Sequence, residues 1–138
     1  MLEYWLWLAH RPNLNEHQQM QLLQSFQTPE GVYQAEPAEF GYFSGLTAQG
    51  RLALTQKDLA PYQAVLEYCQ RENIHILTVS DAEYPRRLRN IYDPPLVLYY
   101  KGTFPQFDGA PAISIVGTRK STAYGQSVAG RMGAEISA

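Results

Sequence analysis

Residues 113–125, Ile-Ser-Ile-Val-Gly-Thr-Arg-Lys-Ser-Thr-Ala-Tyr-Gly, decide the fold that we expect for this chain. The β-branched run Ile113–Val116 predicts a strand that ends at Gly117, and a helix is expected from about Ala123 to the end of the chain. A strand that runs through a glycine turn into a helix N-terminus is an anion-binding arrangement, because loop N–H groups and the positive end of the helix dipole face the same space. The segment therefore predicts an α/β domain with an anion site in its loop.

Arg119 excludes two well-known nucleotide-binding loops. A P-loop that ends in Lys120-Ser121 needs glycine at two earlier positions, which are Ser114 and Arg119 here. A dinucleotide fingerprint that starts at Gly117 needs its second glycine two residues later, which is again Arg119.

The side chains of this loop favour the phosphates of a nucleic-acid strand over a buried pyrophosphate. The planar fork of Arg119 can bind a pair of phosphate oxygens. Lys120 adds a second charge, and Ser121 and Thr122 add hydroxyl donors. A glycine turn of purely structural use is the alternative, since such turns are common after parallel strands.

Two further strands and a helix are expected upstream. The run Ile74–Val79 is bounded by turn-forming residues, and Leu96–Tyr100 follows two prolines and stops at Gly102. A helix is expected over residues 58–72, so strands alternate with helices or long turns as in an α/β sheet. The parallel strand that should follow the last helix is missing, which predicts a truncated fold.

Residues 1–58 predict an all-α bundle of five short helices. Apolar residues recur at helical spacing, and Asn13 or Asn15 can cap the second helix. Thr28 and Glu36 begin the next two. We therefore expect a helical domain over 1–58, followed by an incomplete α/β domain over 59–138.

Composition and charge limit the classes of protein that remain. The 138 residues carry a net charge of −2, which excludes a globally basic nucleic-acid binder. Residues 1–83 hold four basic and ten acidic side chains, whereas 84–138 hold seven and three, so a polyanion would meet the second part. Cys69 is the only cysteine and shares no metal-ligand spacing with the histidines. We expect a cytoplasmic protein without a membrane segment, disulfide, metal or cofactor.

The run Val116–Gly125 resembles the opening motif of the Rossmann-like domain in the DprA (Smf) family. Upstream, Tyr84-Pro85, Leu88, Asp93–Tyr99 and Lys101-Gly102 match the lead-in of that family in order and spacing. The front end of the chain resembles the family's SAM-like helical domain. The resemblance implies a SAM-like bundle followed by the first part of an extended Rossmann-like domain.

The resemblance also implies a function. Members of the family are non-enzymatic proteins that bind single-stranded DNA, protect incoming strands during natural transformation, promote loading of the recombinase RecA, and form homodimers. The motif arginine is a phosphate contact, which carries over to Arg119. The loop neighbours Gly117, Thr118, Lys120 and Ser121 carry over with it, and the adjacent Tyr124 is a candidate for base stacking. The family's later glycine-rich motif is absent from this sequence.

Three alternatives remain open. A Rossmann-like nucleotide-binding or phosphoribohydrolase-type enzyme is the rival from another class. The helical domain could instead be a protein-interaction module. Arg86, Arg87 and Arg89 either extend a basic track or form an ordinary solvated surface. The first helical turn carries Asn13-Leu14-Asn15 where many relatives have Gly-x-Gly, so we expect DNA to bind outside the helical domain.

Overall fold

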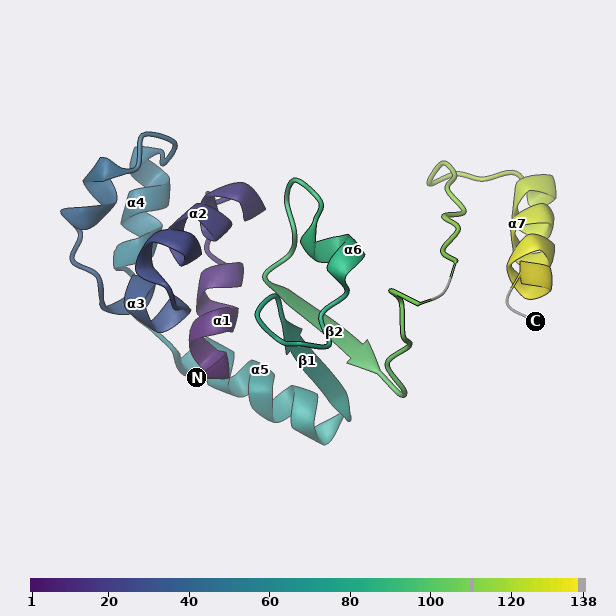
Figure 1. The fold of residues 1–138 in the computed structure, drawn as a ribbon, viewed down its shortest axis with the longest axis horizontal. Coiled ribbons are helices and arrows are strands. Elements are labelled where there is room, and N and C mark those ends of the chain that lie inside the picture. Colours follow the sequence, from purple (N-terminus) through teal and green to yellow (C-terminus); the bar gives the residue numbers. More distant parts are fainter. Residues whose placement is uncertain (110, 137–138) are drawn as a thin grey trace. The chain divides into compact units, whose positions relative to one another are not determined.

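The computed structural model (Figure 1) describes residues 1–109 and 111–136, which divide into two compact units. Unit 1 is Met1–Asp108 and unit 2 is Gly109–Ala138. In chain order, unit 1 contains α1 (Leu2–Ala9), α2 (Glu16–Phe26), α3 (Pro29–Gln34), the 3-10 helix η1 (Glu39–Tyr42), α4 (Ala48–Thr55), α5 (Ala60–Arg71), β1 (Ile74–Thr78), α6 (Arg86–Arg89) and β2 (Val97–Lys101). Unit 2 contains α7 (Ala123–Ile136).

Side-chain caps start three of the helices in unit 1. The Asn15 side chain accepts a hydrogen bond from the Gln18 backbone N–H at 2.8 Å, and the Gln18 side chain accepts one from the Asn15 N–H at 2.9 Å, which is a capping box. Thr28 and Thr47 cap α3 and α4 in the same way. Of the two asparagines expected as caps, Asn15 is confirmed, while Asn13 adopts a left-handed backbone with φ of 61°.

The fourth helix, expected to begin at Glu36, begins at Glu39 instead. It is a single 3-10 turn over Glu39–Tyr42. The Glu39 carboxylate accepts a hydrogen bond from the Glu36 N–H at 2.7 Å, and Gly41 lies within the turn. Glycine disfavours continuation of a helix because it loses more backbone entropy than other residues. The single turn nevertheless brings Phe40 into the core.

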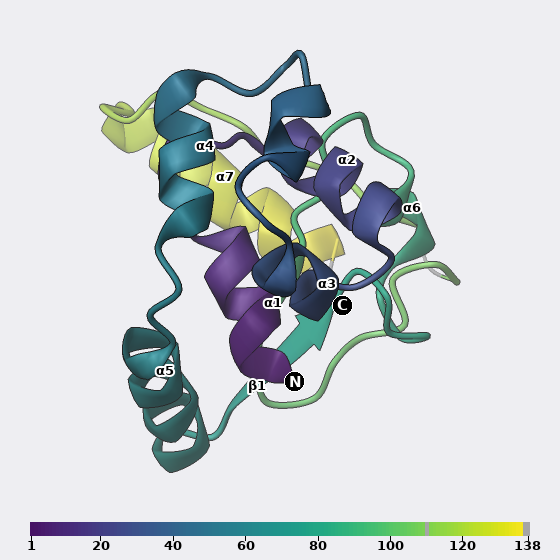
Figure 2. The same cartoon turned by 90° about the vertical axis from the view of Figure 1, so that its left-hand side faces the viewer.

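Helix α1 lies at the centre of unit 1. Its consecutive residues Leu6, Trp7 and Leu8 are fully buried, which is expected of a helix that is apolar around its circumference. It packs against α2 and α3 on one side and against α5 and β2 on the other (Figures 1 and 2). The remaining elements of the unit are thus arranged around this helix.

One hydrophobic core runs through unit 1. It includes Val32 and Leu54 from the helices, and Leu77 and Leu96 from the strand region. Residues on both sides of position 58 therefore share a core. The division into domains 1–58 and 59–138, and their SAM-like and Rossmann-like character, stay predictions.

The two expected upstream strands are confirmed and form one antiparallel pair. Strand β1 pairs with β2 in a register that places Ile74 opposite Lys101 and Thr78 opposite Val97. Helix α5 packs against β1. Gly102 ends β2 with φ of 78°, a conformation that glycine adopts without strain. The mixed helical and β character that the sequence predicts is present, although the sheet is small.

The third expected strand, Ile113–Val116, is wrong. Residues 111–118 have no regular secondary structure, and the sheet of the described residues has two strands. The side chains are exposed, Val116 by 88%. A strand forms only when a neighbour satisfies its backbone N–H and C=O groups, and no such neighbour is present in the described part of the chain. The helix expected from Ala123 is confirmed as α7, with its last two residues outside the described range.

Arg11 connects α1 to the end of α4 and to α5. Its guanidinium donates hydrogen bonds to the carbonyls of Trp7 at 3.0 Å, Ala53 at 3.3 Å and Gln56 at 3.1 Å, and to the Tyr62 hydroxyl. The residue is buried. A buried guanidinium is favourable only while its hydrogen bonds are complete, so Arg11 is a structural residue and is not available to a ligand.

We predict that Arg11→Ala lowers the free energy of unfolding by about 3 kcal/mol, because three carbonyls and a hydroxyl each lose a charged hydrogen-bond donor. Urea denaturation measures the change. Arg71→Ala is the control, since the Arg71 side chain is 71% exposed and its loss should change the stability by less than about 0.5 kcal/mol. Equal effects of the two substitutions would contradict the structural role of Arg11.

Lys57 has a buried ammonium group without a hydrogen-bond partner among the described residues. Its Nζ lies 5.2 Å from the ring centre of Trp7, 5.1 Å from that of Tyr33 and 5.6 Å from that of Phe40. Burial lowers the pKa of Lys57; Glu36 opposes this shift and Arg11 adds to it. The aromatic rings and Glu36 stabilise the charge.

The lowered pKa of Lys57 predicts a pH dependence of stability. As the pH rises toward 10.5, the unfolded chain keeps this proton longer than the folded chain, so the free energy of unfolding increases. Lys57→Met removes this contribution, and the stability of the parent relative to the variant should therefore rise between pH 7 and pH 10. Urea titrations across that range measure it. Lys101→Met, at a side chain that is 61% exposed, should give a difference that stays flat; a flat difference for Lys57→Met as well would refute the burial argument.

Candidate nucleic-acid interface

The segment 117–122 leads directly into α7 and is exposed throughout. Thr122 caps the helix: its Oγ1 accepts a hydrogen bond from the Gly125 N–H at 3.1 Å, and its carbonyl accepts one from the Gln126 N–H at 3.0 Å. The loop therefore ends at a defined helix start, although no strand precedes it in the described residues. Of the expected strand, loop and helix start, the described residues form the loop and the helix start but not the strand.

The hydroxyl groups of the loop differ in what they can still donate. Thr118 Oγ1 donates to the Lys120 carbonyl at 3.0 Å, so its hydrogen is engaged within the loop. Ser121 Oγ accepts from Gln126 Nε2 at 3.2 Å and keeps its own hydrogen for another acceptor. Ser121 can therefore donate to an anion, whereas Thr118 shapes the loop. No sequence pattern pointed to Gln126.

The positive charges of the loop are not compensated within unit 2. Arg119 and Lys120 form no salt bridge with any carboxylate that the structure describes, and both side chains are exposed. The unit contains one acidic residue, Glu135, whose carboxylate lies 4.0 Å from Arg131. The helix dipole of α7 adds positive potential at the same end. The loop thus combines the positive end of a helix with two positive charges that are unpaired among the described residues.

The structure brings the six predicted site residues, Gly117–Ser121 and Tyr124, into one exposed segment. Tyr124 lies in the first turn of α7 and is 79% exposed, so its ring is available to a ligand. A side chain added at Gly117 would meet nothing within 4 Å, so the described contacts do not require glycine there. The side chains of this segment are exposed, which suits an extended ligand.

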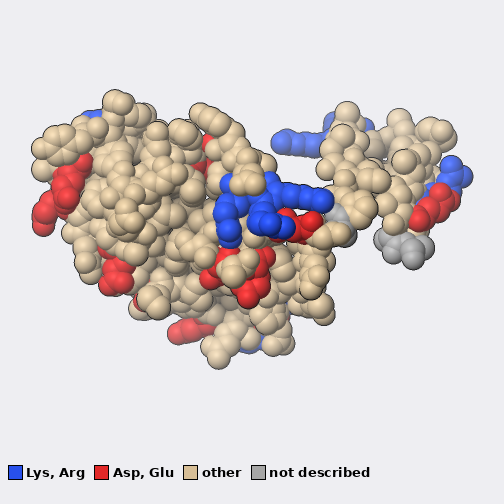
Figure 3. Space-filling view, in the orientation of Figure 1, with Lys and Arg blue, Asp and Glu red and all other residues tan. Residues whose placement is uncertain are grey.

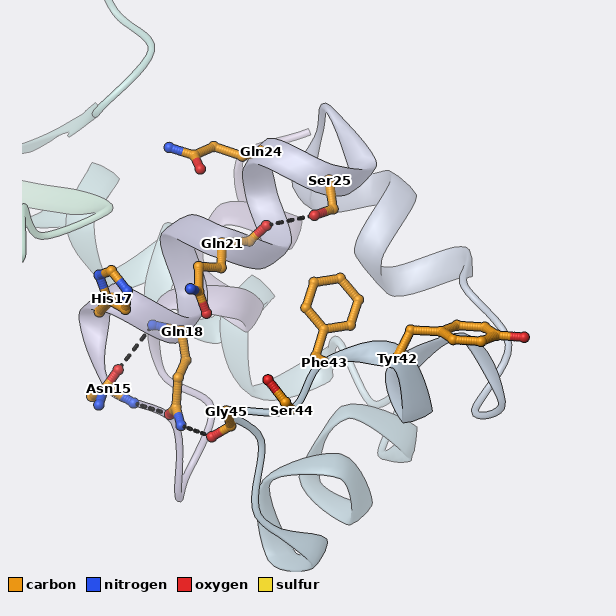
Figure 4. Close-up of a pocket in the computed structure, with 10 residues that line it drawn as sticks. All are labelled: Asn15, His17, Gln18, Gln21, Gln24, Ser25, Tyr42, Phe43, Ser44 and Gly45. Carbon is orange, nitrogen blue, oxygen red and sulfur yellow. Dashed lines mark hydrogen bonds between the residues drawn. The ribbon is translucent and has the colours of Figure 1, made fainter.

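A groove of about 520 Å³ in unit 1 lacks the chemistry of either an active site or a phosphate site. Figure 4 shows its lining side chains between α2 and the segment after η1. They are neutral or amide-bearing apart from one histidine: Asn15, His17, Gln18, Gln21, Gln24, Ser25, Tyr42, Phe43, Ser44 and Gly45. Gln18 is engaged with Asn15 and with the Gly45 carbonyl at 2.6 Å. No cation or carboxylate lines this groove.

Arg89 is part of the fold and not of an exposed basic track. Its guanidinium donates to the Asp81 carbonyl at 2.6 Å and lies 5.5 Å from the ring centre of Tyr84. Tyr84 is buried and donates its hydroxyl hydrogen to the Pro95 carbonyl at 2.8 Å. Asp81 in turn accepts hydrogen bonds from the Thr78 N–H and hydroxyl. The lead-in motif thus holds the connection between β1 and β2 together.

Two further findings concern what the described residues lack. They contain no group of three or more His, Cys, Asp or Glu side chains that could hold a metal ion. None of the helices that the structure describes is long and apolar enough to cross a membrane.

Comparison with known proteins gives consistent matches. The sequence model of the family described as DNA recombination-mediator protein A matches residues 75–138. The DNA processing protein DprA of Bacillus subtilis (strain 168) is 40% identical over 72 residues, which are 52% of this chain and 24% of that protein. Protein Smf of Synechocystis sp. is 32% identical over 127 residues, which are 88% of this chain and 32% of that protein. No solved structure matches the chain.

The similarity reaches beyond the loop. The match to the Synechocystis protein covers most of the chain, and that to protein Smf of Borreliella burgdorferi extends over 95 residues at 27% identity. The chain spans no more than about a third of the length of these relatives, since the matched parts are 24%, 32% and 30% of them.

We predict that Thr122→Ala weakens the start of α7 by about 1 kcal/mol, because the Gly125 N–H loses its acceptor. Amide hydrogen exchange of the first turn of α7 measures the loss as faster exchange. Thr122→Ser keeps the oxygen and should restore most of the protection. Exchange that is equally fast in both variants would show that the cap does not hold the helix start.

Proposed function

Because the chain belongs to the DprA/Smf family of DNA-processing proteins, we propose that it binds single-stranded DNA through the loop 117–122 and the first turn of α7. The observation that carries this proposal is the pair of exposed cations, Arg119 and Lys120, which have no carboxylate partner among the described residues. They lie at the positive end of a helix, where a phosphate is favoured.

Each residue of the site has a proposed role. Arg119 binds two oxygens of one phosphate through its planar fork, and Lys120 supplies a second charge. Ser121 donates the hydroxyl hydrogen that its hydrogen bond with Gln126 leaves available. Tyr124 stacks on a base, which an exposed ring can do with any sequence. Gly117 and Thr118 shape the loop.

The capped start of α2 supports a location outside the helical part. The Asn15 capping box engages the N–H groups of Asn15 and Gln18, and Asn13 has a side chain where a phosphate would need close access to the backbone. The basic residue nearest to this turn, Arg11, is buried and fully hydrogen bonded. The helical part therefore offers a phosphate little to bind.

For the longer protein we propose the activities of the family: protection of incoming single strands in the cytoplasm during natural transformation, and loading of the recombinase RecA. Recombination-mediator membership supports the role in DNA recombination. We also propose a homodimer and an extended Rossmann-like fold, in which further strands would cover the apolar side chains of Ile113 and Ile115, exposed by 64% and 47% here.

A nucleotide-processing enzyme is the second candidate, and the loop chemistry disfavours it. Arg119 occupies the position where both common nucleotide loops require glycine. The carboxylate of unit 2, that of Glu135, belongs to the salt bridge with Arg131 and lies on the last turn of α7, away from the loop. We therefore propose binding without turnover.

We predict that Arg119→Ala weakens oligo-dT binding by the full-length protein by about 1.5–3 kcal/mol, because a charge-assisted phosphate contact is lost. Arg119→Lys should recover part of the affinity, since lysine keeps the charge but not the fork. Fluorescence anisotropy at a fixed salt concentration measures the affinity of each variant for oligo-dT. In a separate titration, the affinity of the parent protein should fall as salt is added. Arg131→Ala, on the helix that follows the loop and 73% exposed, is the matched control and should change little.

Two results would refute the proposal. The first is an Arg131→Ala effect as large as that of Arg119→Ala, which would mean that any charge in unit 2 serves equally well. The second is turnover of ATP or release of a base from a nucleotide by the purified protein, which would favour the enzyme.

A further inference from the structure

Helix α6 holds two arginine side chains outward on a rigid base. Its inner side is fixed by Tyr84, which is buried, and by Arg89, which donates to the Asp81 carbonyl at 2.6 Å. Arg86 and Arg87 on its outer side are exposed. In the face shown in Figure 3, basic side chains gather over α6, with acidic side chains beside them. The two outer guanidinium groups therefore project from a backbone that is already held in place.

The two arginines differ in their electrostatic partners. The Asp108 carboxylate accepts hydrogen bonds from the backbone N–H groups of Arg86 at 2.9 Å and Arg87 at 3.2 Å, and from Arg86 Nε at 3.3 Å. These bonds, the Arg86 N–H first among them, lower the pKa of Asp108. The N–H groups of α6 are thus satisfied internally. The Arg87 guanidinium has no hydrogen bond or salt bridge with any residue that the structure describes.

Tyr92 presents an aromatic ring five residues after Arg87. It is 78% exposed, and one face of the ring is stacked on His17 with a centroid distance of 4.9 Å and an interplanar angle of 5°. The stacking restricts the ring and leaves its other face to solvent. An aromatic ring that is already ordered loses less entropy when a base stacks on it. At most about 17 Å of backbone separates it from Arg87.

We propose that Arg86, Arg87 and Tyr92 form a second contact surface for single-stranded DNA, located in unit 1 and separate from the loop in unit 2. The proposal rests on the proposed function for its ligand class, but on different residues. Exposed arginines bind phosphates, and an exposed ordered ring stacks on a base. A duplex cannot offer an unstacked base to the ring, and an acidic protein would use the arginines without needing Tyr92. The combination therefore favours a single strand.

Asp108 limits the strength of this surface. Its carboxylate pairs with Arg86, so a DNA phosphate must share that guanidinium with it. Removing the carboxylate charge should therefore strengthen binding, which no purely structural role of Asp108 predicts. Asp108→Asn keeps the size of the side chain and an oxygen that can still accept from the N–H groups.

The test is an anisotropy titration of the full-length protein with oligo-dT and with a duplex of equal length. We expect Arg87→Ala to weaken oligo-dT binding about three- to tenfold and Tyr92→Ala about fivefold, with Tyr92→Phe near the parent. Asp108→Asn should strengthen it about twofold or more. Arg71→Ala is the matched control, because this arginine of unit 1 is also exposed and lies over a tyrosine ring, that of Tyr68. Thermal melts confirm that each variant is folded.

The outcomes separate this surface from the loop. If Arg87→Ala and Tyr92→Ala match Arg71→Ala while Arg119→Ala binds weakly, the second surface is refuted and the loop stands; an acidic protein is then the ligand class left for the arginines. If Arg119→Ala binds normally while Arg87→Ala does not, the surface stands and the proposed loop is wrong. Equal losses on oligo-dT and duplex would refute the single-strand assignment of Tyr92.

Discussion

Burial of Trp7 is the packing constraint on which most of unit 1 depends. The side chain is fully buried, its Nε1 donates to the Gln56 carbonyl at 2.9 Å, and the Tyr33 ring packs edge-on against it at 5.1 Å. Arg11 and Lys57 place their cations 5.0 Å and 5.2 Å from its centroid. These neighbours come from the residue that follows the C-cap of α1, from α3 and from the connection between α4 and α5, so a single ring fixes three parts of the chain relative to one another.

This packing holds three cations against aromatic rings, so they are not available to bind a ligand. Arg11 and Lys57 lie against Trp7, and Arg89 lies against Tyr84, each with the rest of its side chain in the core or at its edge. A cation held in this way is desolvated and positioned, and moving it to a phosphate would leave buried acceptors or rings unpaired. Among the exposed arginines, Arg119 in unit 2 and Arg87 in unit 1 have no salt bridge with any carboxylate that the structure describes, whereas Arg71, Arg86 and Arg131 each have one.

The sequence predicted those features that depend on neighbours within one or two helical turns. Asn15 was one of two predicted caps of α2 and Thr28 the predicted start of α3, and both caps act on residues a few positions away. The two strands around residues 74–79 and 96–100 were predicted from their composition, but their pairing with one another was not. The sequence did not predict the role of Arg11, because three of its four acceptors lie 42 to 51 residues away. Nor could it show that Gln126 would engage the Ser121 hydroxyl, since no helical spacing rule pairs a loop residue with a side chain five positions later.

The strand expected over Ile113–Val116 depends on a partner distant in the sequence. The loop that follows it depends only on neighbouring residues. A β-strand needs a second strand, and an apolar, β-branched sequence cannot supply one. The loop needs only Thr122 as a cap, a hydrogen bond from Thr118 to the Lys120 carbonyl, and the helix that begins at Ala123. The charged groups proposed to contact phosphate are therefore presented by local interactions, independent of whether a sheet has formed beside them. A sheet would add depth and rigidity to the site. The positive charge of the site and its hydrogen-bond donors are already set by the residues of the loop.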